Sequence, residues 1–142
     1  MGSIKTYNPK EVTISLGTHI VTGYADDSFV SVAPNGDGIT KRVGCDAEIV
    51  RSISPDDTYI VTLAVLQTSD TNQWLQDRYT EDIDTGDAMF AILIKDLKGG
   101  TVFSADSAWV VRPTTRAYQR ESNNREWEIH TGSGTITEGT WE

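Results

Sequence analysis

Residues 59–74 read YIVTLAVLQTSDTNQW and hold the one clear change of pattern in this 142-residue chain. The first part, Tyr59–Leu66, is rich in β-branched residues and apolar on both faces, which is typical of a strand buried on both sides. In the second part Asp70 stands three residues before Gln73, and this spacing predicts a helix start capped by the aspartate. We therefore expect the most buried strand to be followed by one short helix over residues 71–82.

Outward from this stretch, apolar residues recur mostly with the two-residue period of strands, and Gly, Pro and Asp mark turns between them. The expected strands are 12–16, 19–24, 28–32, 47–53, 89–94, 101–111 and 127–130, with a last edge strand at 135–137. The turn 98–100 closes a long hairpin. Together these elements predict a mainly β fold, a rolled β-sandwich or barrel with one short flanking α-helix.

Composition predicts a single domain over residues 1–142, because no linker, repeat or low-complexity run divides the chain. The net charge of −9 argues against a nucleic-acid binder, which needs a basic patch, and against a partner membrane of anionic lipid. No apolar run is long enough to cross a bilayer, so no membrane anchor is expected. The single cysteine, Cys45, has no partner for an internal disulfide and is expected to be a small buried thiol.

Catalytic motifs are scarce, so we expect no enzyme, no cofactor and no metal. The only histidines, His19 and His130, lie in predicted strands and belong to no metal or nucleophile motif. Residues 82–87 resemble the start of a calcium loop, but the glycine comes one position early and the closing glutamate is missing. A pair of carboxylates for hydrolysis would need a cleft that a sequence does not display.

The four tryptophans leave an alternative function open. A row of exposed tryptophans on a monomeric β-sandwich would indicate a carbohydrate-binding module. Trp74, Trp109 and Trp127 instead lie in apolar surroundings and are expected to pack in the core. Trp141 stands one residue from the C-terminus, and we expect it to dock on a neighbouring subunit.

Five segments in a fixed order resemble the tail-tube (inner tube) proteins of contractile-tailed bacteriophages, which are related to type VI secretion tube proteins. They are Thr22–Asp27, Lys41–Ser52, Leu66–Asn72, Ile94–Gly100 and Arg125–Trp127. The similarity covers nearly the whole chain. One departure is Ala47, where the family commonly has glycine, and its effect is expected to be limited to the local backbone.

The resemblance implies a ring-forming structural subunit without catalytic activity. Six copies would join their sheets into one barrel around a channel, and stacked rings would form the tube through which DNA is ejected. Implied partners are further copies of the chain, the tail sheath protein outside, baseplate and tail-terminator proteins at the ends, and the tape measure protein and DNA transiently in the lumen. The implied location is the tail tube of the virion, after assembly in the host cytoplasm.

Contact and channel residues are expected around residues 33–54. The long loop 33–46 has no place in a compact domain, and with the N-terminal arm 1–9 it is expected to reach an adjacent subunit or ring. Its expected contact residues are Asn35, Gly36, Asp37, Gly38, Ile39, Lys41 and Arg42, together with Trp141.

The following strand is expected to line the channel with one face. That face is largely polar and holds Asp46, Glu48, Val50, Ser52 and Ser54. The opposite face, with Ala47, Ile49, Arg51 and Ile53, is expected in the subunit core. An acidic wall would repel DNA and keep it from adhering. Glu48 facing ordinary solvent, or pairing across a subunit boundary, remains the alternative.

Overall fold

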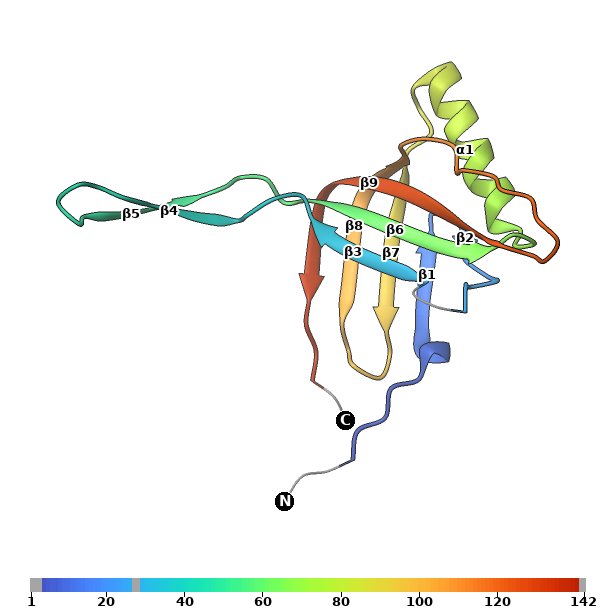
Figure 1. Ribbon diagram of the computed structural model, residues 1–142, viewed down its shortest axis with the longest axis horizontal. Coiled ribbons are helices and arrows are strands. Elements are labelled where there is room, and N and C mark those ends of the chain that lie inside the picture. Colours follow the sequence, from blue (N-terminus) through green and yellow to red (C-terminus); the bar gives the residue numbers. More distant parts are fainter. Residues whose placement is uncertain (1–3, 27–28, 141–142) are drawn as a thin grey trace.

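Strands dominate the computed structural model, which describes residues 4–26 and 29–140 (Figure 1). The strands are β1 (Val12–Leu16), β2 (His19–Ile20), β3 (Val30–Pro34), β4 (Ile39–Val43), β5 (Ile49–Ile53), β6 (Thr58–Leu66), β7 (Phe90–Asp96), β8 (Val102–Val110) and β9 (Asn124–Thr137). A short 3-10 helix, η1 (Pro9–Glu11), precedes β1, and one α-helix, α1 (Thr71–Thr85), follows β6. The predicted fold class, mainly β with one flanking helix, is confirmed.

Seven strands form one antiparallel sheet in the order β2-β1-β7-β8-β9-β6-β3. The 14-residue strand β9 pairs with β6 through its first part and with β8 through its second, so the sheet rolls over along it. At Gly134 a Cβ atom would lie 2.8 Å from Cδ1 of Tyr59, and only glycine permits this close approach. Residues 135–137 form a strand as predicted, but they are the end of β9, where it pairs with β8 alone, and not a separate strand.

The core lies inside the roll and is built from the inward residues of both layers. β6 contributes Val61, Leu63 and Val65, and β9 contributes Trp127 and Ile129, all at most 1% exposed. Trp127 therefore packs in the core as expected. The alternating burial along β1, β7 and β8 supplies the opposite wall.

Helix α1 covers one end of the roll and inserts Leu75 into the core (Figure 1). It extends three residues past the predicted end, to Thr85, and the left-handed backbone of Gly86 (φ 70°) terminates it. Asp70 is the N-cap residue, but its side chain makes no capping hydrogen bond, so that detail was wrong. Ser69 Oγ instead accepts a hydrogen bond from Thr71 N at 3.2 Å. No helix in the described ranges is long and apolar enough to cross a membrane.

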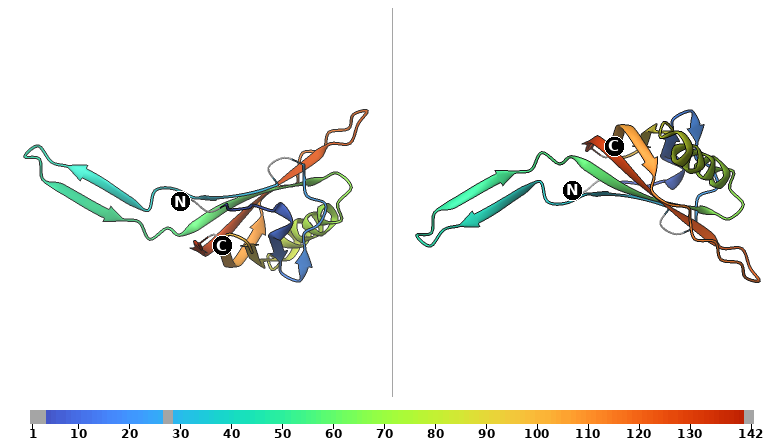
Figure 2. Two further views of the ribbon diagram at one scale, coloured as in Figure 1. Left: turned by 90° about the horizontal axis from the view of Figure 1, so that it is seen from below. Right: turned by 90° about the horizontal axis from the view of Figure 1, so that it is seen from above.

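Strands β4 and β5 form a separate two-stranded sheet that projects far from the roll (Figures 1 and 2). Segment 33–46, expected as a loop, therefore contains the end of β3, a turn and all of β4. The placement of Ile49, Arg51 and Ile53 in the subunit core was wrong. β5 pairs only with β4, no second layer covers either face in the described part of the chain, and every residue of both strands is exposed.

Two further details concern the tip of this hairpin. Cys45 is exposed there, so its expected burial was wrong. Ala47 has φ 67°, a left-handed conformation that glycine adopts with less strain. The departure from glycine noted in the sequence thus falls at a position where the backbone conformation favours glycine.

Candidate functional site

Backbone hydrogen bonds join the two strands of the β4–β5 hairpin, and no second layer covers it among the described residues. Five residue pairs, from Ile39↔Ile53 at the base to Val43↔Ile49 near the tip, set its register. Ser54 N donates to Gly38 O at 2.8 Å and closes the base, while Gly44 N donates to Glu48 O at 2.8 Å at the tip. The hairpin therefore presents a two-stranded surface with a defined register.

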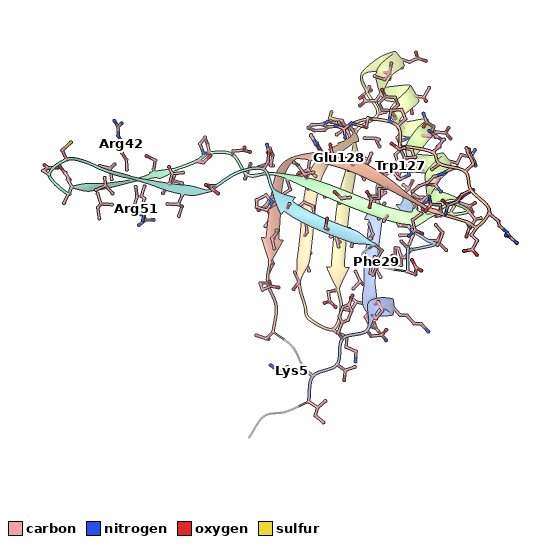
Figure 3. The ribbon with its side chains drawn as sticks, viewed as in Figure 1. Lys5, Phe29, Arg42, Arg51, Trp127 and Glu128 are labelled. Carbon is pink, nitrogen blue, oxygen red and sulfur yellow. The ribbon has the colours of Figure 1, made fainter. Side chains whose placement is uncertain are left out.

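This hairpin has two chemically different faces because side chains alternate along each strand. We call the first the aliphatic face; it holds Ile39, Lys41, Val43, Ile49, Arg51 and Ile53. We call the second the polar face; it holds Thr40, Arg42, Val50 and Ser52. Figure 3 shows Arg42 and Arg51 pointing to opposite sides of the hairpin.

The residues predicted to line a channel are divided between the tip and the base. Asp46 and Glu48 lie in the tip, where Asp46 Oδ1 accepts a hydrogen bond from Glu48 N at 3.3 Å. Ser52 is on the polar face. Ser54 is at the base, and its Oγ accepts from Asp56 N at 3.2 Å. Asp46 and Ser54 thus stabilise local turns of the chain.

The residues predicted to contact other subunits fall in the first half of the hairpin and its approach. Asn35 is anchored to β6, since its N and Nδ2 donate to O and Oγ1 of Thr58 at 3.1 and 3.3 Å. Ile39 and Lys41 lie on the aliphatic face and Arg42 on the polar face. Trp141 lies outside the described residues.

Sequence reasoning missed the second half of the aliphatic face. Ile49, Arg51 and Ile53 alternate just as Ile39, Lys41 and Val43 do, and the tip residues Gly44–Glu48 separate the two runs. Pairing the two runs as the strands of one hairpin predicts that these six side chains share one face.

The edges of the seven-stranded sheet are a second feature open to other chains. β3 pairs with β6 and, within the described residues, has no strand on its other side. At the other edge β2 covers only Ser15 and Leu16 of β1. Exposed strand edges of this kind accept further strands through their free backbone groups.

Catalytic or sugar-binding geometry is not evident in the described residues. They contain no group of three or more His, Cys, Asp or Glu side chains able to hold a metal. Asp82 in the calcium-loop-like segment accepts a hydrogen bond from Ala88 N. A hollow of about 660 Å³ against β9 is lined by two carboxylates, Glu126 and Glu128, and Glu128 is already paired with Arg112 at 3.3 Å and with His130 at 3.1 Å.

The tryptophans form no exposed row in the described part of the chain. Trp127 is fully buried, and Trp74 is half-buried between Phe90 and the stacked ring of His19, 5.2 Å away. Trp109 is half-buried on β8 and does not belong to the core cluster, so its expected core packing was wrong. The platform required by a carbohydrate-binding module is therefore missing there.

His19 gives a pH-dependent prediction for stability. Its Nε2 lies 2.9 Å from Thr71 Oγ1, and burial lowers its pKa below the usual 6.5, with the charge of Asp70 partly opposing this. Since the folded protein binds this proton less readily than the unfolded chain, stability is lost as the pH falls through 6.5 and below. We expect the melting temperature to fall less for His19→Gln than for the unmodified chain between about pH 7.5 and pH 5. An equal fall in both would contradict this role.

Comparison with known proteins identifies the fold and the family. The profile of the bacteriophage PhiTE tail tube protein family matches residues 11–139. Structural protein ORF10 of Pseudomonas phage KPP10 is 30% identical over 146 residues, covering 97% of this chain and 84% of that protein.

Two solved structures share the fold at low sequence identity. The tube-terminating cap of the anti-feeding prophage aligns with a TM-score of 0.64 and 13% identity, over 98% of this chain and 95% of that one. The sheath–tube complex of the extracellular contractile injection system PVC aligns with a TM-score of 0.63 and 9% identity, over 94% and 92% of the two chains. The family match and the phage relative together confirm the resemblance drawn from the sequence: the chain belongs to the bacteriophage PhiTE tail tube family and is a structural tail tube protein of a phage virion.

Proposed function

We propose that this chain assembles into hexameric rings, that the rings stack into a tube with a negatively charged channel, and that DNA leaves the virion through it. The observation that carries the proposal is the projecting β4–β5 hairpin, in which every strand residue is exposed. An isolated two-stranded hairpin is at best marginally stable in water, so a long projecting one is a natural site for contact with other subunits. The role is structural, without catalysis.

Ring closure follows from the two open sheet edges. β3 ends the strand order on one side, and on the other the short β2 leaves most of β1 uncovered, so each copy offers one edge to each neighbour. Such head-to-tail contact closes into a ring when the rotation between copies divides a full turn. The sheets of the six copies then form one continuous barrel.

The hairpin and the chain ends supply further contacts between subunits or rings. Residues 35–38, with Ile39, Lys41 and Arg42, reach the adjacent copy, as do the N-terminal arm 1–9 and Trp141. Asp46, Glu48, Ser52 and Ser54 face the channel. Six copies at −9 each give a ring a formal charge of −54, which repels DNA across a Debye length of about 8 Å.

Partners beyond the chain itself are proposed by analogy with the relatives. The neighbours in structure come from a sheath–tube complex and a tube-terminating cap, which supports a sheath protein outside the tube and a terminator at its end. Baseplate protein at the other end, and tape measure protein and DNA in the lumen, complete the set. Assembly takes place in the host cytoplasm.

Purification and microscopy of the chain test the proposal directly. We expect rings, then filaments, by negative-stain microscopy and sedimentation as the protein concentration rises. A chain that stays monomeric at every concentration and binds glycans on an array would overturn the proposal in favour of a carbohydrate-binding module, which the buried Trp127 does not favour.

Glu48→Lys tests the channel assignment. The substitution changes the charge by two per copy, twelve per ring, and turns a repulsive wall locally attractive to DNA. We expect normal tubes but DNA ejection slowed several-fold, most strongly at low salt, in phage carrying the change. The control is Asp77→Lys, the same charge change at an exposed position on α1. Ejection as fast with Glu48→Lys as with the control would remove Glu48 from the channel.

A further inference from the structure

Two like charges lie directly opposite each other in the middle of the aliphatic face. Lys41 on β4 is the cross-strand partner of Arg51 on β5. Side chains in such pairs are neighbours, with Cβ atoms about 4.5–5.5 Å apart, and like charges there destabilise the pairing. Among residues 4–26 and 29–140, neither side chain forms an ion pair. Within one chain this arrangement is therefore unfavourable.

Aliphatic side chains frame the two cations on both sides. The pair Ile39↔Ile53 lies toward the base and Val43↔Ile49 toward the tip. These four side chains are 57%, 77%, 58% and 64% exposed, respectively. A cation removed from water needs a partner of opposite charge. Two cations surrounded by aliphatic side chains therefore fit an opposing surface that combines aliphatic side chains with a carboxylate.

The charge distribution identifies this chain itself as the source of that surface. β4 and β5 carry three cations, Lys41, Arg42 and Arg51, and no acidic residue. Removing these three charges from the net −9 leaves −12 on all other residues. A second copy therefore presents an excess of carboxylates to the cationic strands. The attraction between these opposite charges also speeds the encounter of the two copies.

We propose that the aliphatic face docks on an acidic, partly apolar surface of a second copy, with a carboxylate of that copy held between Lys41 and Arg51. This inference rests on the proposed tube function and deepens it, because it names which face makes the contact and the chemistry of the acceptor. Arg42, on the opposite face, stays outside this contact (Figure 3).

Charge reversal on the aliphatic face tests the docking contact. The double variant Lys41→Glu with Arg51→Glu keeps two like charges opposite each other, so the hairpin itself is as strained as before. We expect it to raise the protein concentration needed for assembly by roughly 100-fold, because the acceptor carboxylate now meets like charge. Lys98→Glu with Arg120→Glu is the matched control, with the same change of four charges at two exposed positions outside the hairpin, and should alter that concentration less than threefold.

The single change Lys41→Glu distinguishes docking from hairpin stability. It places a glutamate opposite Arg51, an attractive cross-strand pair that should stabilise the hairpin. Assembly should nevertheless weaken at least tenfold. Assembly that strengthens, or that is equally impaired by Lys98→Glu at an exposed position outside the hairpin, would overturn the proposal.

Zero-length carbodiimide coupling of assembled tubes locates the acceptor. Mixed tubes of ordinary and ¹⁵N-labelled chains should yield a peptide in which the Lys41 amine is joined to an Asp or Glu of the other isotope. Coupling only within one chain, or none at Lys41, contradicts the proposal. If the unmodified chain never assembles, the tube function fails; if it assembles and the charge variants assemble equally well, only this inference fails.

Discussion

Replacing residues 39–53 with a two-residue Asn-Gly turn is expected to abolish ring and tube formation while leaving the domain folded. Gly38 and Ser54 already pair across the base, with Ser54 N donating to Gly38 O at 2.8 Å. A two-residue Asn-Gly turn is the connection that such a pair of antiparallel strands accepts. The replacement therefore removes the hairpin and closes the chain where the structure already brings it together.

Stability should change little because the deleted strands contribute nothing to the core. All of their residues are exposed, and the buried cluster is drawn from β1, β6–β9 and α1 together with Val21. We expect the melting temperature to stay within about 3 °C, since surface changes usually alter stability by no more than about 0.5 kcal/mol. Circular dichroism during heating measures this, and sedimentation velocity measures assembly.

The control retains the hairpin and alters only its polar face, with Thr40→Ser and Ser52→Ala, and should assemble normally. A shortened variant that still forms tubes would show that the hairpin is dispensable for assembly. A shortened variant that unfolds would show instead that the hairpin belongs to the cooperative fold.

Local periodicity predicted most elements of this fold but not their neighbours. The alternation in Val12–Leu16 and the apolar run in Tyr59–Leu66 identified β1 and β6, and the change after Asp70 identified α1 to within three residues at its end. β9 was split in prediction because Gly132 and Gly134 interrupt its pattern. In the folded chain these glycines let one long strand turn between two layers, a requirement that only the neighbouring Tyr59 reveals.

The site was predicted in part, for a related reason. Lys41 and Arg42 were expected at a contact surface, whereas Arg51 and its aliphatic neighbours were assigned to the core. A period of two residues shows that a strand has an apolar face. It does not show whether that face meets the chain's own second layer or another copy. Here β5 has no second layer above it in the described ranges, and the apolar alternation gave no sign of that.

Asn72→Leu is expected to destabilise the fold strongly, although it alters a single side chain. Asn72 opens α1 and is buried against β9, where its Oδ1 accepts a hydrogen bond from Trp127 Nε1 at 2.9 Å. Its Nδ2 donates to three backbone carbonyls, those of Leu66, Gln67 and Ser69, at 3.0–3.2 Å. One amide thus joins the end of β6, the turn after it and the core tryptophan.

Leucine has a similar volume but supplies none of these hydrogen bonds. The buried indole N–H loses its acceptor and Gln67 O loses the Nδ2 donor, whereas Leu66 O and Ser69 O still accept from the backbone N–H groups of Ser69 and residue 72. Each unsatisfied buried group costs about 1–3 kcal/mol. We expect a loss of about 3 kcal/mol, or roughly 10 °C in melting temperature for a domain of this size. The control is Gln73→Leu, the same loss of an amide at the next, exposed position, which should change stability by less than about 0.5 kcal/mol.

A double-mutant cycle with Trp127→Phe shows whether the indole–amide bond itself carries this effect. Trp127→Phe removes the donor and leaves a cavity in the core, so it is destabilising alone. In the Trp127→Phe background, however, Asn72→Leu leaves no indole N–H without an acceptor. The double variant should therefore lose about 1–2 kcal/mol less unfolding free energy than the sum of the two single changes. Urea denaturation of the four proteins gives this coupling. Strict additivity would mean that Asn72 stabilises the fold only through the three carbonyls, and that the tryptophan is held by packing alone.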